Sequence, residues 1–279
     1  MTIQKIAEEV LGSRKYSAVD RAIVERICEE SISKYAKPKD IIKAVKKELH
    51  IIHGAFLVEN CHIKAEALLD AYSGGDIKTD RVLAAKLMAL HISTRERLGE
   101  ADEIYSFLSA FIDPGDGIID IGCGFNPFAL PFFTVLPKNY CALDMNLSTI
   151  SLLAKYFALA KLPYRSELFD AASQALGAPG DLVFLLKLFP LLERQKKGCG
   201  FAILDALDFR TAFVSFPLKS ASGKEKGMEV FYSSSFEAEL PEGLTIVEKA
   251  KFNNEMVYVL GKLSQKLIRS FRREGISRS

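Results

Sequence analysis

The stretch IIDIGCGFNPFAL, residues 118–130, decides the fold. It opens as a short apolar run, typical of a buried strand, and Asp120-Ile121-Gly122-Cys123-Gly124 then leads into a helix start. Glycines let the backbone turn sharply and let a ligand approach closely, and a first helical turn offers unpaired N–H groups. A dinucleotide-binding loop would need a third glycine near Pro127, and the flanking phenylalanines leave little room for a pyrophosphate. The stretch therefore predicts a ligand loop of another kind.

The residues around this stretch divide into a helical part and an α/β part. Before residue 112 the apolar residues recur at helical spacing, and we expect helices over 20–35, from Pro38 onward, and over about 60–73 and 79–111. After the turn sequence at 113–117, short apolar runs alternate with helical segments, which is typical of a mostly parallel, doubly wound sheet. The strands are expected at about 117–121, 139–143, 164–169, 180–186, 211–217, 243–249 and 254–261.

The pattern change predicts three parts of the chain. Residues 1–112 form a helical N-terminal domain, residues 113–262 a ligand-binding α/β domain, and residues 263–279 a basic tail that is a last helix or a flexible arm. With 279 residues, of which 49% are hydrophobic, the chain can build such a core. Neither a membrane-spanning run nor a secretory signal is evident, and we expect a cytoplasmic protein.

The cysteines and histidines do not predict a metal site. Five scattered cysteines favour buried thiols in a reducing compartment over a disulfide framework. His50, His53, Cys61 and His62 are residue types that bind zinc, but they lack paired short ligand spacings. Because His50 and His53 fit one face of a helix, we expect helix histidines and no metal.

The placement of charge is more informative than its total. The net charge is only +2, yet residues 31–54 carry six lysines against two acids, a local charge of +4, and residues 262–279 carry a local charge of +5. Such runs can contact nucleic-acid phosphates. An ordinary solvated helix face explains the lysines between 34 and 47 equally well, and the sequence leaves both readings open.

Two aspartates follow later strands of the predicted sheet. Asp144 ends the second strand about 20 residues after the glycines, where a carboxylate can accept both ribose hydroxyls of an adenosine ligand. Asp170 ends the third strand. Either aspartate could instead cap a helix, but the ordered set of glycines and two aspartates favours a nucleoside site.

The D-x-G-x-G pattern resembles the first motif of class I methyltransferases. The match becomes specific in DLVFLLKLFPLLERQ (181–195) and AFVSFPLKSASGKEKGMEVFY (212–232), which resemble the aminoglycoside-resistance 16S ribosomal RNA (guanine-N7) methyltransferase family. SRKYSAVD (13–20), KELHIIHGAF (47–56) and HISTRERLGEADEIYSF (91–107) extend this similarity, which covers residues 10–261.

The resemblance implies a function as well as a fold. It implies a Rossmann-like, seven-stranded class I fold that uses S-adenosyl-L-methionine and releases S-adenosyl-L-homocysteine. The family methylates N7 of a guanine in the decoding A site of 16S rRNA and docks on the 30S subunit through its helical N-terminal domain. We therefore expect aminoglycoside resistance and a monomer with no membrane partner.

The resemblance also assigns residues to roles. The implied cofactor-binding residues are Arg97, Asp120, Gly122, Gly124, Asn126, Asp144, Met145, Asp170, Lys187 and Leu188. The implied catalytic residues are Lys187, Glu193, Ser215 and Phe216. The RNA-binding residues are expected to be Arg14, Lys15, Lys39, Lys43, Lys46, Lys47, Lys226 and Met228.

Some of these roles have plain alternatives. Glu193 could form a solvated helix pair with Arg194, Arg97 could pair with a neighbouring glutamate, and Lys226 could be an exposed loop lysine.

The chemistry of guanine N7 agrees with what the sequence lacks. N7 carries an in-plane lone pair and no proton, so its attack on a sulfonium methyl group needs no general base. No histidine follows residue 91, and no nucleophile with an adjacent base is evident. Methylation of another nucleotide in the same region, such as adenine at N1, is the first alternative. A non-catalytic ribosome-binding relative and a small-molecule methyltransferase are the others.

Overall fold

The computed structural model describes residues 2–176, 180–218 and 235–262. The predicted RNA contacts Lys226 and Met228, the loop around them and the tail 263–279 lie outside the described residues. The chain forms two compact units. The first comprises Met1–Gly99, Gly124–Phe132 and Ala142–Asp170, and the second comprises Glu100–Cys123, Phe133–Cys141 and Ala171–Ser279.

Both units draw on residues from either side of position 112. The assignment of separate roles to residues 1–112, 113–262 and 263–279 therefore stays a prediction.

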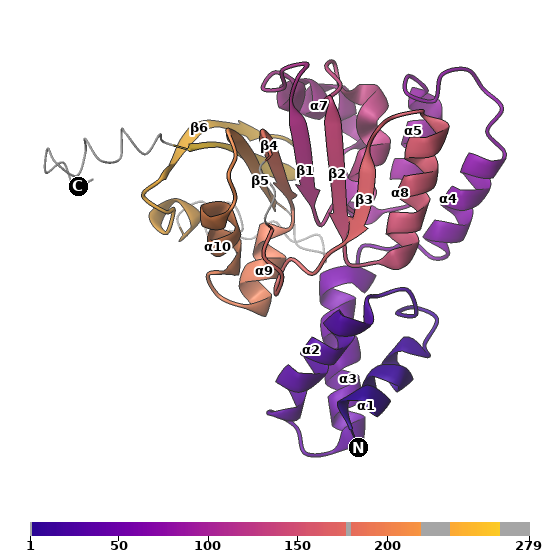
Figure 1. The fold of residues 1–279 in the computed structure, drawn as a ribbon, viewed down its shortest axis with the longest axis vertical. Coiled ribbons are helices and arrows are strands. Elements are labelled where there is room, and N and C mark those ends of the chain that lie inside the picture. Colours follow the sequence, from indigo (N-terminus) through magenta and orange to yellow (C-terminus); the bar gives the residue numbers. More distant parts are fainter. Residues whose placement is uncertain (1, 177–179, 219–234, 263–279) are drawn as a thin grey trace, which may run out of the picture. The chain divides into compact units, whose positions relative to one another are not determined.

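The first three helices pack around one apolar core (Figure 1). They are α1 (Ile3–Leu11), α2 (Arg21–Ile32) and α3 (Pro38–Leu49). The Asp20 carboxylate accepts a hydrogen bond from the Ala22 N–H and caps α2, and Pro38 stands in the first turn of α3 as predicted. The expected apolar stripe of α3 is buried, whereas Lys39, Lys43 and Lys47 are exposed.

A π-helical turn, η1 (His50–Gly54), continues α3 and changes the expected placement of the histidines. His50 is exposed and His53 is buried, so the two do not share one face. The wider turn of a π-helix explains this, because it alters the angular spacing between residues three apart. His53 Nε2 lies 3.0 Å from Asn146 Nδ2, and burial lowers the pKa of His53 to about 4, which makes it a neutral acceptor.

The predicted single helix over 79–111 is wrong. The chain instead forms, after α4 (Cys61–Asp70), the short helices α5 (Arg81–Met88), α6 (Ile92–Arg95), η2 (Leu98–Glu100) and α7 (Ala101–Ser109). His91 is extended, at φ −128° and ψ 129°, and forms a β-bridge with Leu57. The Thr94 hydroxyl also hydrogen-bonds to the Met88 carbonyl oxygen, at 2.7 Å. These contacts favour a break that helical periodicity alone does not reveal.

The predicted seven-stranded, mostly parallel sheet is confirmed, with strand order β3-β2-β1-β4-β5-β7-β6 (Figure 1). The strands are β1 (Gly117–Ile121), β2 (Asn139–Asp144), β3 (Arg165–Leu168), β4 (Leu182–Leu186), β5 (Thr211–Pro217), β6 (Leu244–Lys251) and β7 (Glu255–Lys262). β1, β4 and β5 pair in parallel, and β7 is antiparallel to both β5 and β6. The carboxyl ends of the parallel strands therefore share one edge, where open α/β sheets bind ligands.

The helices between the strands also follow from the sequence. They are α8 (Leu147–Leu159), α9 (Phe189–Gln195) and α10 (Cys199–Ala206). The helix start after the glycines is a 3-10 helix, η3 (Asn126–Phe132), with Pro131 inside it.

Two absences concern only the part of the chain that the structure describes. Across residues 2–176, 180–218 and 235–262, no helix combines the length and apolar character that a membrane crossing requires. In the same ranges, His, Cys, Asp and Glu side chains nowhere gather in threes as a metal site would need. All five cysteines are free and buried, as predicted.

Candidate cofactor and RNA-binding sites

In the first unit, the second glycine of the loop contacts the aspartate at the end of β2. The Gly124 N–H donates to Asp144 Oδ2 at 2.9 Å, and the Asn146 N–H donates to Oδ1 at 2.9 Å. Gly124 has a φ of +49°, and a Cβ there would lie 3.0 Å from the His91 ring. A side chain at this position would be both strained and crowded, which explains the glycine.

Asp144 is a buried acceptor rather than a helix cap. It is 8% exposed, and the N-cap of α8 is Asn146, whose side chain accepts from the Thr149 N–H. Burial raises the pKa of Asp144 to about 6, although three backbone N–H groups oppose the rise. Each carboxylate oxygen has a second lone pair, so both can accept a ligand hydroxyl in addition to the backbone N–H.

Two more predicted residues meet in the same unit. Arg97 and Asn126 are 3% and 2% exposed, and Arg97 Nη1 donates to Asn126 Oδ1 at 3.0 Å. A buried guanidinium suits a ligand carboxylate, because its planar N–H groups can bind both oxygens. Pairing of Arg97 with Glu96 or Glu100 stays the alternative to this role.

Asp170 follows β3, whose end contacts the end of β2, and it carries a partner that the sequence did not indicate. The Phe169 N–H donates to the Asp144 carbonyl oxygen at 2.9 Å, which joins the loops after β2 and β3. Arg26 of α2 donates to Asp170 Oδ2 from Nε at 2.8 Å and to Oδ1 from Nη2 at 3.1 Å. Arg26 lies on the charged face of a helix 144 residues away in sequence, where nothing marks it as a site residue.

In the second unit, the first glycine of the loop approaches the end of β4. Gly122 has a φ of +65°, and a Cβ there would lie 2.8 Å from the Leu188 side chain. The Tyr140 hydroxyl donates to Asp120 Oδ2 at 2.7 Å, and Asp120 is 1% exposed. The positive φ and the packing of Leu188 favour glycine at position 122, in agreement with the predicted sharp turn.

Lys187 belongs to a buried network that includes a residue missed by the sequence analysis. The Lys187 N–H donates to Ser215 Oγ at 2.8 Å, and Ser215 Oγ in turn donates to Glu255 Oε1. Glu255 Oε2 lies 3.6 Å from Lys187 Nζ, and all three residues are buried. Lys187 also has a φ of +59°, a strained conformation for a residue with a side chain. The network holds this strained turn at the carboxyl end of β4.

The other two predicted catalytic residues occupy structural positions. Glu193 accepts hydrogen bonds from the N–H groups of Gly198, at 2.7 Å, and Gly200, at 2.8 Å, and so stabilises the start of α10. It does not form the solvated pair considered as its alternative. Phe216 is 2% exposed, with its ring against Phe189 and Phe236. Their catalytic roles stay predictions.

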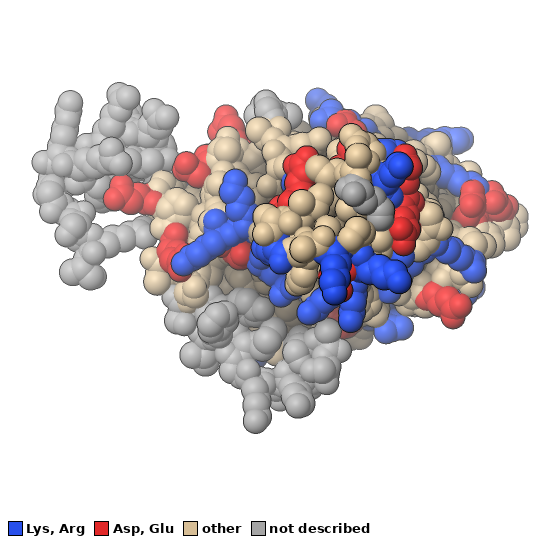
Figure 2. Space-filling model, turned by 90° about the horizontal axis from the view of Figure 1, so that it is seen from below, with Lys and Arg blue, Asp and Glu red and all other residues tan. Residues whose placement is uncertain are grey.

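The predicted RNA contacts on the first unit are accessible. Figure 2 looks at the molecule from the side of α1–α3 and shows Lys and Arg side chains gathered on this face, with acids between them. Arg14, Lys15, Lys39, Lys43 and Lys47 are exposed, and Lys46 is half-buried. The lysines are thus available for phosphate contacts, although exposure alone does not exclude a solvated face.

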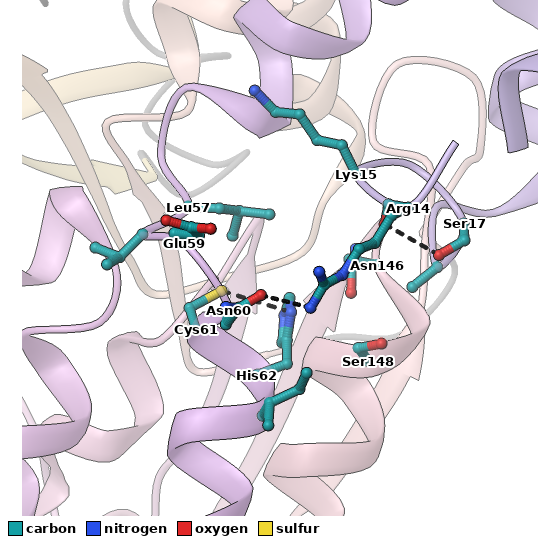
Figure 3. A pocket seen from close by; sticks show the side chains of 13 residues that line it. Arg14, Lys15, Ser17, Leu57, Glu59, Asn60, Cys61, His62, Asn146 and Ser148 are labelled. Carbon is teal, nitrogen blue, oxygen red and sulfur yellow. Dashed lines mark hydrogen bonds between the residues drawn. The ribbon is translucent and has the colours of Figure 1, made fainter. Parts of the chain in front are cut away.

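Arg14 and Lys15 also line an open pocket of about 560 Å³ in the first unit (Figure 3). Arg14 Nη2 donates to Asn60 Oδ1 at 2.7 Å, and Lys15 Nζ lies 2.9 Å from His50 Nδ1. Figure 3 shows the Arg14 side chain directed into the pocket towards Asn60 and His62. The pocket therefore presents a cationic group beside amide and imidazole groups.

Comparison with known proteins decides the family. The family model described as ribosomal RNA methyltransferase (FmrO) matches residues 12–259. The chain belongs to this family. An FmrO relative from Serratia marcescens, named 16S rRNA (guanine(1405)-N(7))-methyltransferase, is 33% identical over 94% of this chain and 99% of its own length. A relative of the same name from Micromonospora echinospora is 30% identical over 93% of this chain and 97% of its own length.

Solved structures of FmrO relatives agree with the fold. The crystal structure of 16S rRNA methyltransferase RmtF in complex with S-adenosyl-L-homocysteine aligns with a TM-score of 0.85 and 31% identity, over 94% of this chain and 98% of RmtF. The 16S rRNA methylase RmtB aligns with a TM-score of 0.80 and 28% identity, over 94% of this chain and 99% of RmtB. The chain is thus an S-adenosylmethionine-dependent rRNA methyltransferase of class I fold, as the sequence predicted.

Proposed function

We propose that this chain transfers the methyl group of S-adenosyl-L-methionine to N7 of a guanine in the decoding A site of 16S rRNA. The observation that carries the proposal is the pair of relatives named 16S rRNA (guanine(1405)-N(7))-methyltransferase, which match more than nine-tenths of this chain at 33% and 30% identity. The substrate is the assembled 30S subunit, the enzyme acts as a cytoplasmic monomer, and the modification confers aminoglycoside resistance.

The residues present fit the proposed cofactor. Gly122 and Gly124 adopt left-handed conformations, and a Cβ at either position would be crowded by Leu188 or His91, so the loop keeps the sharp turn that the proposed cofactor loop requires. The Asp144 carboxylate suits ribose hydroxyls, and the buried Arg97 guanidinium suits the carboxylate of the methionine moiety. Asp170 is proposed to accept a hydrogen bond from the adenine amino group, and Asp120, Asn126, Met145, Lys187 and Leu188 complete the proposed contacts. When bound, the cofactor supplies an electrophilic methyl group on sulfur.

The protein's part in the reaction is placement. Because N7 of guanine has a lone pair and no proton, no residue needs to act as a general base. Lys187 and Ser215 are held by Glu255 at the ends of β4 and β5. They are the residues that we propose lie beside the base. Holding the reacting atoms about 3 to 3.5 Å apart and in line can supply much of the barrier reduction. Glu193 contributes by fixing the loop before α10.

The proposed RNA contacts supply the affinity that positions the substrate. A guanine in structured RNA has to leave its stack, at a cost of a few kcal/mol. Phosphate contacts from Arg14, Lys15 and the lysines of α3 would offset this cost, and their contribution would weaken with salt. Lys226 and Met228 are proposed to act on the substrate side.

The modified atom can be identified directly. Purified 30S subunits from a susceptible bacterium are incubated with the enzyme and the cofactor, and the 16S rRNA is treated with borohydride and aniline, which cleave at N7-methylguanine. We expect cleavage at one guanine of the A site and drug resistance in cells that express the protein. A reverse-transcription stop at an adenine without cleavage would instead indicate methylation of N1. No methylation despite binding of the subunit would indicate a non-catalytic relative.

The affinity for S-adenosyl-L-homocysteine is expected to fall in mild acid. Burial raises the pKa of Asp144 to about 6, so its carboxylate accepts ribose hydroxyls above this pH and becomes protonated below it. The loss should be about fourfold between pH 7.5 and pH 5.5, where about a quarter of the groups stay ionised. Isothermal titration calorimetry measures it. The Asp144→Asn variant cannot titrate here and should bind weakly at every pH. An equal loss in this variant would assign the effect to another group.

A further inference from the structure

The Arg26–Asp170 pair joins a helix that has no assigned role to the loop proposed to bind adenine. Two parallel hydrogen bonds, at 2.8 and 3.1 Å, connect the guanidinium to both carboxylate oxygens. The Arg26 and Asp170 side chains are 19% and 10% exposed, so water screens the pair little. Arg26 Nη1 also donates to Glu30 at 3.1 Å, which holds the guanidinium from its other side.

The start of α2 is itself fixed to the loop that follows Asp144. The Asp20 N–H donates to the Met145 carbonyl oxygen at 3.0 Å, and the Leu147 N–H donates to the Ala18 carbonyl oxygen at 2.7 Å. Met145 also packs against the apolar core of the first three helices. Arg26 therefore stands on a helix whose place relative to the adenosine-binding loops is set by backbone hydrogen bonds.

This arrangement determines how Asp170 can meet a base. An ionised carboxylate only accepts hydrogen bonds, and its orientation decides which lone pairs remain directed at a ligand. A bidentate guanidinium fixes the carboxylate plane more strictly than an ammonium group can, and it balances the buried charge. The 6-amino group of adenine donates to such an acceptor, whereas the 6-carbonyl oxygen of hypoxanthine is itself an acceptor and is repelled.

We propose that Arg26 is a positioning residue that orients the Asp170 carboxylate and thereby selects the adenine base of the cofactor. This inference rests on the proposed function, in which Asp170 binds the adenine amino group. Arg26 acts through Asp170 and takes no part in methyl transfer.

The test compares S-adenosyl-L-homocysteine with S-inosyl-L-homocysteine, whose base carries a carbonyl oxygen in place of the 6-amino group and a proton on N1. In Arg26→Ala, we expect the affinity for the adenosyl ligand to fall about tenfold, while the affinity for the inosyl ligand changes less than about threefold. Arg26→Lys keeps the charge without the planar fork and should lose part of the preference. It also covers the case in which the alanine variant does not fold, which thermal unfolding will reveal.

The matched control is Arg21→Ala, on the same helix. Arg21 pairs with Glu25 and Glu8 at the surface, so its loss should leave both affinities unchanged. A fall in both affinities by the same factor in Arg26→Ala would make the pair a structural tie and overturn the inference. Tighter binding of the adenosyl ligand by Arg26→Ala would overturn it as well, because Arg26 would then compete with adenine for the Asp170 carboxylate.

A further variant separates this inference from the proposed function. Asp170→Asn introduces an amide that can donate to the 6-carbonyl oxygen, so the preference for adenine should decrease. An unchanged preference would remove Asp170 from the adenine site and refute that part of the proposed function. A decreased preference in Asp170→Asn with an unchanged one in Arg26→Ala would refute only the role of Arg26.

Discussion

Replacement of Asp144 by alanine is expected to lower the affinity for S-adenosyl-L-homocysteine at least tenfold. Asp144 is the buried carboxylate whose oxygens already accept from the N–H groups of Gly124 and Asn146. Hydrogen bonds to a charged acceptor contribute about 1.5 to 3 kcal/mol each, which corresponds to a factor of about ten or more in the dissociation constant. Calorimetric titration at pH 7.5 measures the change.

The control for this variant is Asp40→Ala, which removes an exposed carboxylate of α3 and should leave the affinity unchanged. The alanine at position 144 also leaves two backbone N–H groups without this acceptor, so thermal unfolding must show that the variant is folded at the titration temperature. A folded variant with the original dissociation constant would exclude Asp144 from the cofactor site.

Reversing the charge of the exposed lysines of α3 is expected to reduce methylation of 30S subunits by about a hundredfold or more. The variant carries Lys39→Glu, Lys43→Glu and Lys47→Glu, all at exposed positions. Each lost phosphate contact should reduce the slope of the logarithm of the binding constant against the logarithm of salt concentration by about one. The introduced glutamates also repel the phosphates. Methyl incorporation and subunit binding at several salt concentrations measure both effects.

The matched control reverses three exposed lysines elsewhere, with Lys86→Glu, Lys138→Glu and Lys196→Glu. It changes the net charge by the same amount, so it isolates the position of the charges from their sum. Both variants should bind S-adenosyl-L-homocysteine normally. Equal losses of methylation in the α3 variant and the control variant would show that the lysines of α3 form an ordinary solvated helix face.

Point variants test the docking role better than removal of the helical region. Deleting residues 1–110 would also remove Arg97, which contacts Asn126, and Arg26, which contacts Asp170. It would further expose Met145 by removing the core against which this side chain packs. Loss of activity in such a truncated chain would therefore follow from damage to the proposed cofactor residues as readily as from lost docking.

Local patterns predicted all seven strands, because an apolar run of four to eight residues between turn residues depends little on its partners. The points at which helices end or change geometry were harder to predict. The break at His91 results from a bridge to Leu57, and the widened turn at His50–Gly54 divides two histidines between solvent and the buried hydrogen bond of His53 with Asn146. Contacts between distant residues decide such positions, and periodicity does not contain them.

The residues of the proposed site show the same contrast between local patterns and contacts of distant residues. The glycine loop, Asp144 and Asp170 could be proposed from the sequence because strand ends and left-handed turns impose residue types at fixed short spacings. Glu255 and Arg26 could not be predicted, because their partners, Ser215 and Asp170, lie 40 and 144 residues away in the sequence. A charged residue in an amphipathic pattern looks the same whether it faces water or a buried carboxylate.

The sequence by itself determined where the seven strands lie, the glycine turn and the family resemblance, because these depend on local residue patterns. Only the tertiary structure decided which charges are paired: Lys187 with Glu255, and Asp170 with Arg26. The physical reason is that the cost of burying a charge is offset by whatever group folding brings beside it, and that neighbour depends on the path of the whole chain.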